Sequence, residues 1–184
     1  VDSDPVTVGN TFNTTISGLP NKEYHLWVKG TSNMTGLPGD QPPSIAYGQH
    51  RVLMDDPAGP YEVGSFVFSD GGGKTIRQDV TTGDIFAGTR YYAIVKMDSA
   101  GTRVVTWNTS SETATGPYTL AVEDKTEIGY TGDTVPVTLV PSGGSDEIRL
   151  LAGWNFVSTP SVLKNGTDTM AIFSGVNSSG HSIF

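Results

Sequence analysis

The fold is decided by residues 89–110, which read TRYYAIVKMDSAGTRVVTWNTS. Two runs rich in aromatic and β-branched residues flank a four-residue segment, Asp98 to Gly101. Such runs favour strands, and a short loop that contains glycine between them predicts a β-hairpin. Apolar side chains alternate onto both faces of the first run, as is typical of central strands. We therefore expect a buried hairpin at the centre of an all-β domain.

Further strands are predicted wherever apolar residues alternate between turn signals, at residues 6–17, 23–31, 49–54, 64–69, 74–81 and 117–123. The segment 32–48 holds three prolines and three glycines, which favours a long surface loop. About eight strands in ~120 residues, joined by short turns, match the spacing of an antiparallel sandwich. The sequence therefore predicts an all-β fold, an immunoglobulin-like antiparallel β-sandwich.

Three parts are expected along the chain. Residues 1–124 form the sandwich, and residues 125–146 hold one more strand, at 133–140, followed by a Gly/Ser linker. Pro136 restricts that strand to a sheet edge or a bulge. Residues 147–184 are mostly β and begin a second module or supply an exchanged strand segment. Because the chain begins without methionine and stops within an apolar segment, we expect a mature or excised piece of a longer protein.

The composition excludes several classes of function. The net charge of the 184 residues is −8, so the surface would repel the phosphates of nucleic acids and anionic membranes. No cysteine is present, which excludes disulfides, zinc-thiolate sites and thiol catalysis. No apolar run approaches the ~20 residues that span a bilayer. We expect neither a nucleic-acid partner nor a membrane span within this segment.

No catalytic constellation is found in the sequence. Residues 71–75, Gly-Gly-Gly-Lys-Thr, resemble part of a phosphate-binding loop, but the earlier glycine of that motif is missing and a strand is expected afterwards. A glycine hairpin turn is the better interpretation. His25, His50 and His181 lack metal-ligand spacing, and His25 is expected at the surface. No Gly-x-Ser-x-Gly motif houses a serine nucleophile, so we expect that the protein is not an enzyme.

Two neighbouring carboxylates, Asp55 and Asp56, are weak candidates for a metal site. Neighbours in a strand point to opposite faces, whereas the turn predicted at 55–60 brings them together. Either a calcium-binding role or a turn-capping role follows. The sequence indicates no other cofactor.

Five of the eight asparagines stand in the glycosylation pattern Asn-x-Ser/Thr. Most of them lie at predicted strand ends or in loops, which suits attachment of a glycan. The density of the pattern indicates an extracellular glycoprotein, and the alternative is that these are unmodified turn residues. The candidates are Asn13, Asn33, Asn108, Asn165 and Asn177.

Several segments resemble an uncharacterised domain family of methanogenic archaea, found in predicted surface-layer or sheath-like cell-envelope proteins. The resemblance covers about residues 6–123 and is carried by residues 19–31 (LPNKEYHLWVKGT), 39–43 (GDQPP) and 88–93 (GTRYYA). Residues 151–160 (LAGWNFVSTP) are similar to a Gly-Trp-Asn-x-x-Ser-x-Pro motif of the same envelope proteins. That motif tends to lie near the mature N-terminus in the family, whereas here it follows the sandwich. The resemblance transfers no catalytic residue.

The resemblance implies a structural component of an archaeal cell envelope, a surface-layer or sheath-like coat outside the cell. Such a coat would self-associate into a lattice, tube or filament, by edge-strand pairing or by contacts of the sandwich ends. Glycans and an acidic surface would keep the coat hydrated, and calcium would bridge subunits. The alternative is a carbohydrate-binding or adhesin module on the cell surface, for which Trp27, Tyr47, Tyr61 and Tyr130 would line a sugar platform.

Overall fold

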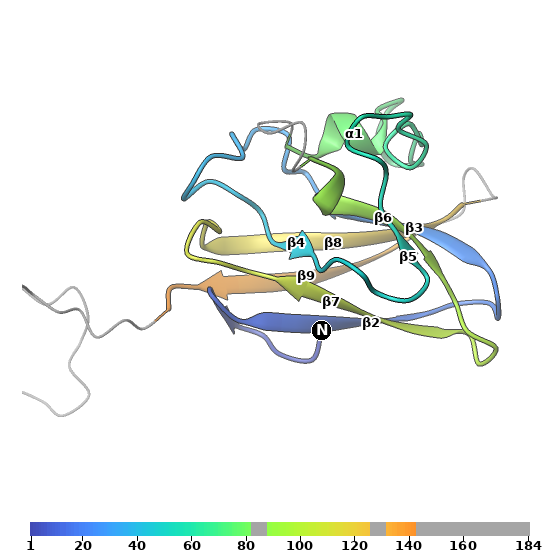
Figure 1. The fold of residues 1–184 in the computed structure, drawn as a ribbon, viewed down its shortest axis with the longest axis horizontal. Helices are drawn as coiled ribbons and strands as arrows, with labels where there is room; N and C mark the ends of the chain where they lie inside the picture. The colour runs from blue at the N-terminus through green and yellow to red at the C-terminus, as the bar shows by residue number, and fades with distance from the viewer. Residues whose placement is uncertain (82–87, 126–131, 143–184) are drawn as a thin grey trace, which may run out of the picture. The chain divides into compact units, whose positions relative to one another are not determined.

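The computed structural model describes residues 1–81, 88–125 and 132–142, which belong to one compact unit built on two β-sheets (Figure 1). The predicted β-sandwich is confirmed, and all strand pairs are antiparallel except β1 with β9. The linker beyond residue 142 and the second module at 147–184 lie outside the described residues. The larger sheet has the order β1 (Val6–Thr7), β9 (Asp133–Val140), β8 (Gly116–Asp124), β3 (Glu23–Lys29), β6 (Tyr92–Lys96), β5 (Val52–Leu53); the smaller has the order β2 (Thr11–Ser17), β7 (Thr102–Asn108), β4 (Ser44–Ile45).

The main hydrophobic core lies between the two sheets. Trp107 of β7 is fully buried, and its ring stacks on Phe12 of β2 with a centroid distance of 6.1 Å. Leu26 of β3 and Leu120 of β8 belong to the same core from the larger sheet. Each such side chain contributes about 1.5–3 kcal/mol through the apolar area that it removes from water. The apolar side chains that alternate along these strands therefore face the interior between the two sheets.

The predicted hairpin at residues 89–110 is wrong in one respect. Its two arms are β6 and β7, but β6 pairs in the larger sheet and β7 pairs in the smaller one. The four-residue loop does close a turn, in which the Gly101 N–H donates to the Asp98 carbonyl at 3.1 Å. After the turn the chain crosses to the other sheet instead of returning beside β6. Each arm finds its partners among strands that are distant in sequence.

This crossing is fixed by a second turn beside it, between β2 and β3, which crosses between the sheets in the opposite direction. The Gly18 N–H donates to the Gly101 carbonyl at 2.8 Å, and the Asn21 N–H donates to the Asp98 carbonyl at 3.0 Å. Gly101 has a φ of +77°, and a Cβ added to it would lie 2.3 Å from the Gly18 carbonyl oxygen. Glycine is therefore required at this contact of two backbones.

Residues 54–81, which we call the cover segment, lie over the outer face of the larger sheet (Figure 1). Ile76 and Val80 at the two ends of the short helix α1 (Ile76–Asp79) are buried against a second core. That core also holds Phe68 from the cover segment and Trp27 from β3, whose rings lie 5.2 Å apart. The central strands of the larger sheet are thus buried on both faces, which explains their nearly continuous apolar sequence.

Four predicted strands are wrong, split or too long, and the loop predicted at 32–48 contains β4, whose Ile45 is buried. The strand predicted at 6–17 is split into β1 and β2, which lie in different sheets. Residues 64–69 form turns, and of residues 49–54 only β5 pairs as a strand. The segment 74–81 contains α1 instead of a strand, because Thr75 caps the helix: its side chain accepts from the Gln78 N–H, and the Gln78 side chain accepts from the Thr75 N–H. The glycine turn at 71–73 is present, since Val67 and Thr75 form an antiparallel bridge around it.

The outer edge of β9 is closed to further strand pairing between Asp133 and Thr138. β1 pairs only with Leu139 and Val140, so this stretch has no neighbouring strand on its outer side. The Thr138 N–H points outward and donates to the Asp4 carboxylate at 2.9 Å. Pro136, whose backbone nitrogen would also point outward, has no N–H. Thr134 is the next residue of this outward set, and its N–H donates to Asp133 at 2.8 Å. As expected from Pro136, this is an edge, and it offers no open donor to an incoming strand.

Candidate functional site

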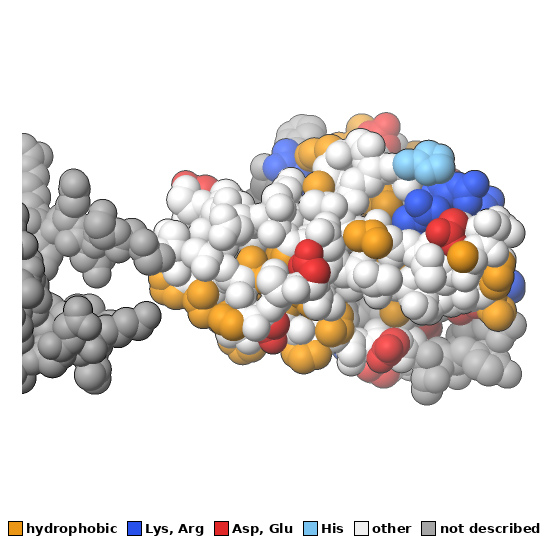
Figure 2. Space-filling view, turned by 90° about the horizontal axis from the view of Figure 1, so that it is seen from below, with side chains coloured by type: hydrophobic (Ala, Val, Ile, Leu, Met, Phe, Trp, Pro, Cys, Tyr) orange, Lys and Arg blue, Asp and Glu red, His pale blue; other side chains and the backbone are white. Residues whose placement is uncertain are grey.

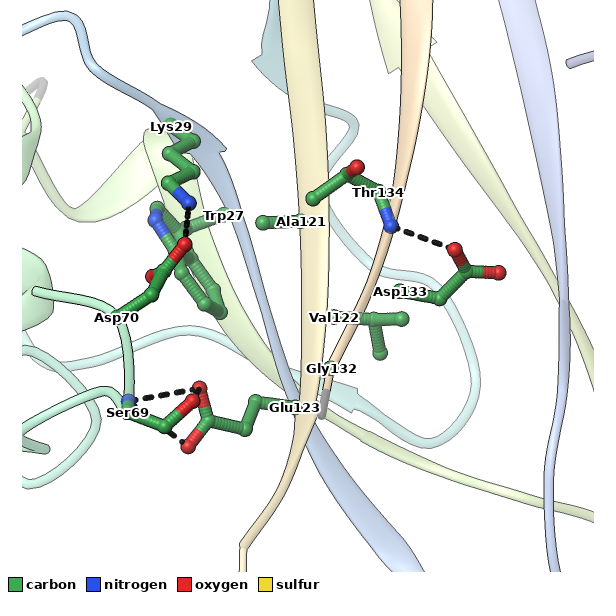
Figure 3. Close-up of a pocket in the computed structure, with 10 residues that line it drawn as sticks. All are labelled: Trp27, Lys29, Ser69, Asp70, Ala121, Val122, Glu123, Gly132, Asp133 and Thr134. Atoms are coloured by element: carbon green, nitrogen blue, oxygen red, sulfur yellow. Dashed lines mark hydrogen bonds and ion pairs between the residues drawn. The ribbon is translucent and has the colours of Figure 1, made fainter. Parts of the chain in front are cut away.

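A small hollow of about 120 Å³ lies between the cover segment and the start of β9 (Figure 3). One basic and three acidic side chains line it. We therefore take this hollow as the candidate functional site in the part of the chain that the structure describes. A hollow of this size is smaller than the roughly 300–1,000 Å³ of a typical ligand pocket. Its lining consists of Trp27, Lys29, Ser69, Asp70, Ala121, Val122, Glu123, Gly132, Asp133 and Thr134.

The charged groups of this hollow are bound to protein partners. Glu123 on β8 is 3% exposed, and its two carboxylate oxygens each accept from the Ser69 N–H at 3.1 Å. One of them also accepts from the Ser69 hydroxyl at 3.1 Å. Lys29 forms an ion pair with Asp70, and Asp133 is turned away from that pair (Figure 3). Glu123 thus fastens the cover segment to β8.

Two more buried carboxylates belong to the cover segment: Asp79 binds it to β3 and the residue after β3, and Asp55 binds groups within the segment itself. Asp79, the last residue of α1, accepts from the Trp27 indole N–H at 3.1 Å and from the Gly30 N–H at 2.9 Å. Asp55 accepts from the backbone N–H groups of Val63 and Gly64 at 3.0 and 2.9 Å. Hydrogen bonds to a buried charged group contribute more than neutral ones, about 1.5–3 kcal/mol each. Asp79, Asp55 and Glu123 are therefore structural clamps.

The structure shows Asp55 and Asp56 in turn-capping positions. Asp55 is buried and bonded as described, whereas Asp56 is exposed and accepts from the Ala58 N–H at 2.8 Å. Among residues 1–81, 88–125 and 132–142, no group of three or more His, Asp or Glu side chains is arranged to hold a metal ion. The calcium role of this pair remains a prediction.

The sequon asparagines differ in their surroundings. Asn33 and Asn108 are exposed, whereas Asn13 is half-buried. The Asn13 side-chain amide donates to Asp2 at 2.8 Å, and its oxygen accepts from the Thr106 hydroxyl at 2.8 Å. Asn33 and Asn108 are thus the described candidates that offer an open amide nitrogen. Asn165 and Asn177 lie outside the described residues.

Trp27, the largest ring of the predicted aromatic platform, does not face solvent. Trp27 is 2% exposed, as its alternation in β3 predicts, and contacts Phe68 rather than solvent. Tyr47 is 59% exposed, and its hydroxyl accepts from Arg90 at 2.6 Å. Tyr61 is half-buried beneath the Arg77 guanidinium, 3.4 Å from the ring centroid. Tyr130 lies outside the described residues.

His25 is buried, against the expectation of a surface histidine. It is 2% exposed, its ring stacks on Phe66 of the cover segment at 3.9 Å, and its Nδ1 has no hydrogen-bond partner. Burial is the main cause that lowers its pKa from 6.5 to about 4, and the Lys125 charge acts in the same direction. The neutral ring is part of the packing that holds the cover segment in place.

This burial predicts a pH-dependent stability. Between pH 6.5 and 4 the unfolded chain binds a proton on His25 that the folded chain does not, so acidification lowers the free energy of unfolding by about 2–3 kcal/mol. Below pH 4 this contribution is constant. His25→Phe keeps the ring contact and removes the proton, so urea denaturation across this range should show a flatter profile. The exposed His50→Gln is the matched control, and equal slopes for wild type and His25→Phe would contradict the assignment.

The buried carboxylates were not found by sequence reasoning. Glu123 and Ala121 alternate with the core residues of β8 and therefore lie on the second face of that strand. The cover segment buries that second face. A usable signal for Asp79 was the pattern Thr75-x-x-Gln78, which marks a helix start.

The comparisons with known proteins add no family. No family model and no curated protein matches the chain. One matching solved structure is the seventh ScaB type I cohesin from Pseudobacteroides cellulosolvens, with 10% sequence identity and a TM-score of 0.32. The match covers 76% of this chain and 89% of that one. At this identity and TM-score we draw nothing about function from it, and the resemblance to archaeal envelope proteins remains a prediction.

Proposed function

We propose that this chain is a structural module of an archaeal cell-surface coat, which assembles through contacts between β-sandwiches. The observation that carries the proposal is how the buried carboxylates are used. Asp79 and Glu123 bind N–H groups across the boundary between the cover segment and the larger sheet, and Asp55 binds two backbone N–H groups within the cover segment. A domain whose buried charges serve its own rigidity is suited to bearing load in a coat.

The outer face of the smaller sheet supports an outward, hydrated orientation. Its side chains are mostly hydroxyls and amides. Thr11 of β2 lies beside Asn108 of β7, and Thr15 of β2 lies beside the apolar Val104 of β7. Asn108 is one of the exposed sequon asparagines and lies on this face. A glycan there would extend from the sheet without crossing the core.

The closed edge of β9 limits how such modules join. Edge-strand pairing needs open N–H groups, and Asp4, Asp133 and Pro136 remove them along most of this edge. The opposite edge of the larger sheet, β5, is only two residues long. Contacts between side chains on the lateral sides of the sandwich are therefore the favoured mode of association.

Self-assembly of the purified full chain tests this function. We expect sheets, tubes or filaments in negative-stain electron microscopy, together with concentration-dependent sedimentation. Adding a chelator checks the calcium hypothesis separately, and an unchanged assembly would remove it. A chain that stays monomeric at every concentration and binds members of a glycan array would instead support the adhesin alternative.

A further inference from the structure

Three basic side chains gather where β5, β6 and β7 meet on one lateral side of the sandwich. The Arg51 guanidinium donates to the Met97 carbonyl at 3.1 Å, and Arg103 donates to the adjacent Lys96 carbonyl at 3.0 Å. Lys96 is exposed between them, and its N–H donates to the Arg51 carbonyl. We call Arg51, Lys96 and Arg103 the basic side. Figure 2 shows Lys and Arg side chains gathered at one end of the face that it displays, beside a histidine.

The nearby carboxylates are engaged with partners of their own. Glu23 lies opposite Lys96 in the register of β3 and β6, but its carboxylate forms an ion pair with Lys125 at 2.9 Å. Asp98 accepts from the Ala100 and Thr102 N–H groups, both at 2.9 Å, within its turn. Within the described parts of the chain, the basic side makes no ion pair at 4.0 Å or less. Lys96 is exposed, Arg51 and Arg103 are half-buried beside it, and the charges of Glu23 and Asp98 lie close enough to interact with Lys96 and Arg103. In a chain of net charge −8, Lys96 is the cation of this side that is open to an acidic surface.

The opposite lateral side of the sandwich is acidic. Residues 1–5 bridge the edges of the two sheets there, because Asp2 binds Asn13 on β2 and Asp4 binds the Thr138 N–H on β9. Asp133 lies on the same edge of β9, and all three aspartates are exposed. We call Asp2, Asp4 and Asp133 the acidic side. It lies at the β1–β9 end of the sheet order that has β5 at its other end.

We infer that a second copy of this chain docks its acidic side on the basic side, head to tail. The inference rests on the proposed self-assembly and names its contact surfaces. Opposite charges on opposite sides of one module give a heterologous contact, which repeats into a filament, or into a ring where the rotation closes, instead of forming a two-fold dimer. Because the outward N–H groups of β9 are already bonded, side chains rather than backbone groups form the contact. Charge complementarity then sets how the two copies align and how fast they associate.

Charge reversal on each side tests the inference. Lys96→Glu/Arg103→Glu in the full chain should weaken self-association at least about tenfold in sedimentation velocity, since like charges then face each other. Asp4→Lys/Asp133→Lys should weaken it equally. Asp4→Asn/Asp133→Asn keeps oxygens that can accept from the Thr138 and Thr134 N–H groups, so it separates the loss of charge from an opened β9 edge. An equimolar mixture of the two variants should assemble again, because each reversed side meets its complement. Lys74→Glu/Arg90→Glu changes the net charge by the same amount elsewhere and should assemble like wild type.

The outcomes separate the inference from the function on which it rests. Circular dichroism and thermal melting of each variant identify any loss of folding, and rescue by mixing is itself evidence that both variants are folded. If wild type assembles and both reversed variants assemble equally well, the pairing of these sides is wrong while the coat function stands. If the basic-side variant fails and mixing does not restore assembly, the basic side has another partner and the inference is wrong. A wild type that never assembles overturns both.

Discussion

Replacing Gly101 by alanine should lower the free energy of unfolding by at least about 3 kcal/mol. Two costs add at this position. An alanine at a φ of +77° is strained by about 1–2 kcal/mol, and its Cβ would lie 2.3 Å from the backbone oxygen of Gly18. Backbone cannot rotate away as a flexible side chain would, so the two turns between the sheets have to separate. Equilibrium denaturation in urea measures the difference.

Gly72→Ala is the matched control, because it imposes the strain of a positive φ without a clash between the added Cβ and another atom. Gly72 has a φ of +62° and nothing within 4 Å of the added Cβ, so the expected cost is about 1 kcal/mol. The difference between the two variants isolates the contact between the turns. Equal losses of stability for Gly101→Ala and Gly72→Ala would show that the Gly18–Gly101 contact does not hold the crossing.

Replacing Asp79 by alanine should cost about 3–5 kcal/mol. The substitution leaves the Trp27 indole N–H and the Gly30 N–H without their acceptor, and burial denies the Trp27 group a water in its place. Because Trp27 belongs to the second core, its fluorescence should change together with stability. Chemical denaturation followed by tryptophan emission measures both effects.

Asp70→Ala provides the comparison for a carboxylate that is not a clamp. Asp70 forms its ion pair with Lys29 at the surface, where such pairs contribute about 0–1 kcal/mol. Combining Asp79→Ala with Trp27→Phe completes a double-mutant cycle, in which the Trp27–Asp79 hydrogen bond should appear as a non-additive term. Additive losses would show that the Trp27–Asp79 hydrogen bond does not carry the effect of Asp79, and would leave the Gly30 bond and α1 as its sources.

The sequence predicted the fold class because alternation reports directly on burial. The strands β2, β3, β7 and β9 fall within predicted segments, and β8 extends the predicted segment 117–123 by one residue at each end. The hairpin at residues 89–110 failed for a physical reason: a tight turn fixes the local direction of the chain but not the sheet that the next strand joins. That choice depends on contacts between residues far apart in sequence, among them the bonds of Gly18 with Gly101 and of Asn21 with Asp98.

The candidate site was harder to predict than the fold. Glu123 lies on the face of β8 opposite to its core residues, and Asp79 lies in α1, where the sequence predicts a strand. Their burial depends on the cover segment, whose turns and short helix have little periodicity of their own. His25 was misassigned for the same reason. In contrast, the effect of Pro136 was predictable, because a missing N–H depends on one residue alone.

The parallel pairing of β1 with β9 has a mechanical consequence. Val6 pairs with Leu139 and Thr7 with Val140, and the Val8 N–H donates to the Val140 carbonyl at 2.9 Å. Tension along the chain that pulls β1 by its N-terminal end and β9 by its C-terminal end draws these strands past each other along their length. The hydrogen bonds between β1 and β9 are then loaded together in shear. They have to break at the same time instead of one after another, which raises the force needed to separate the strands.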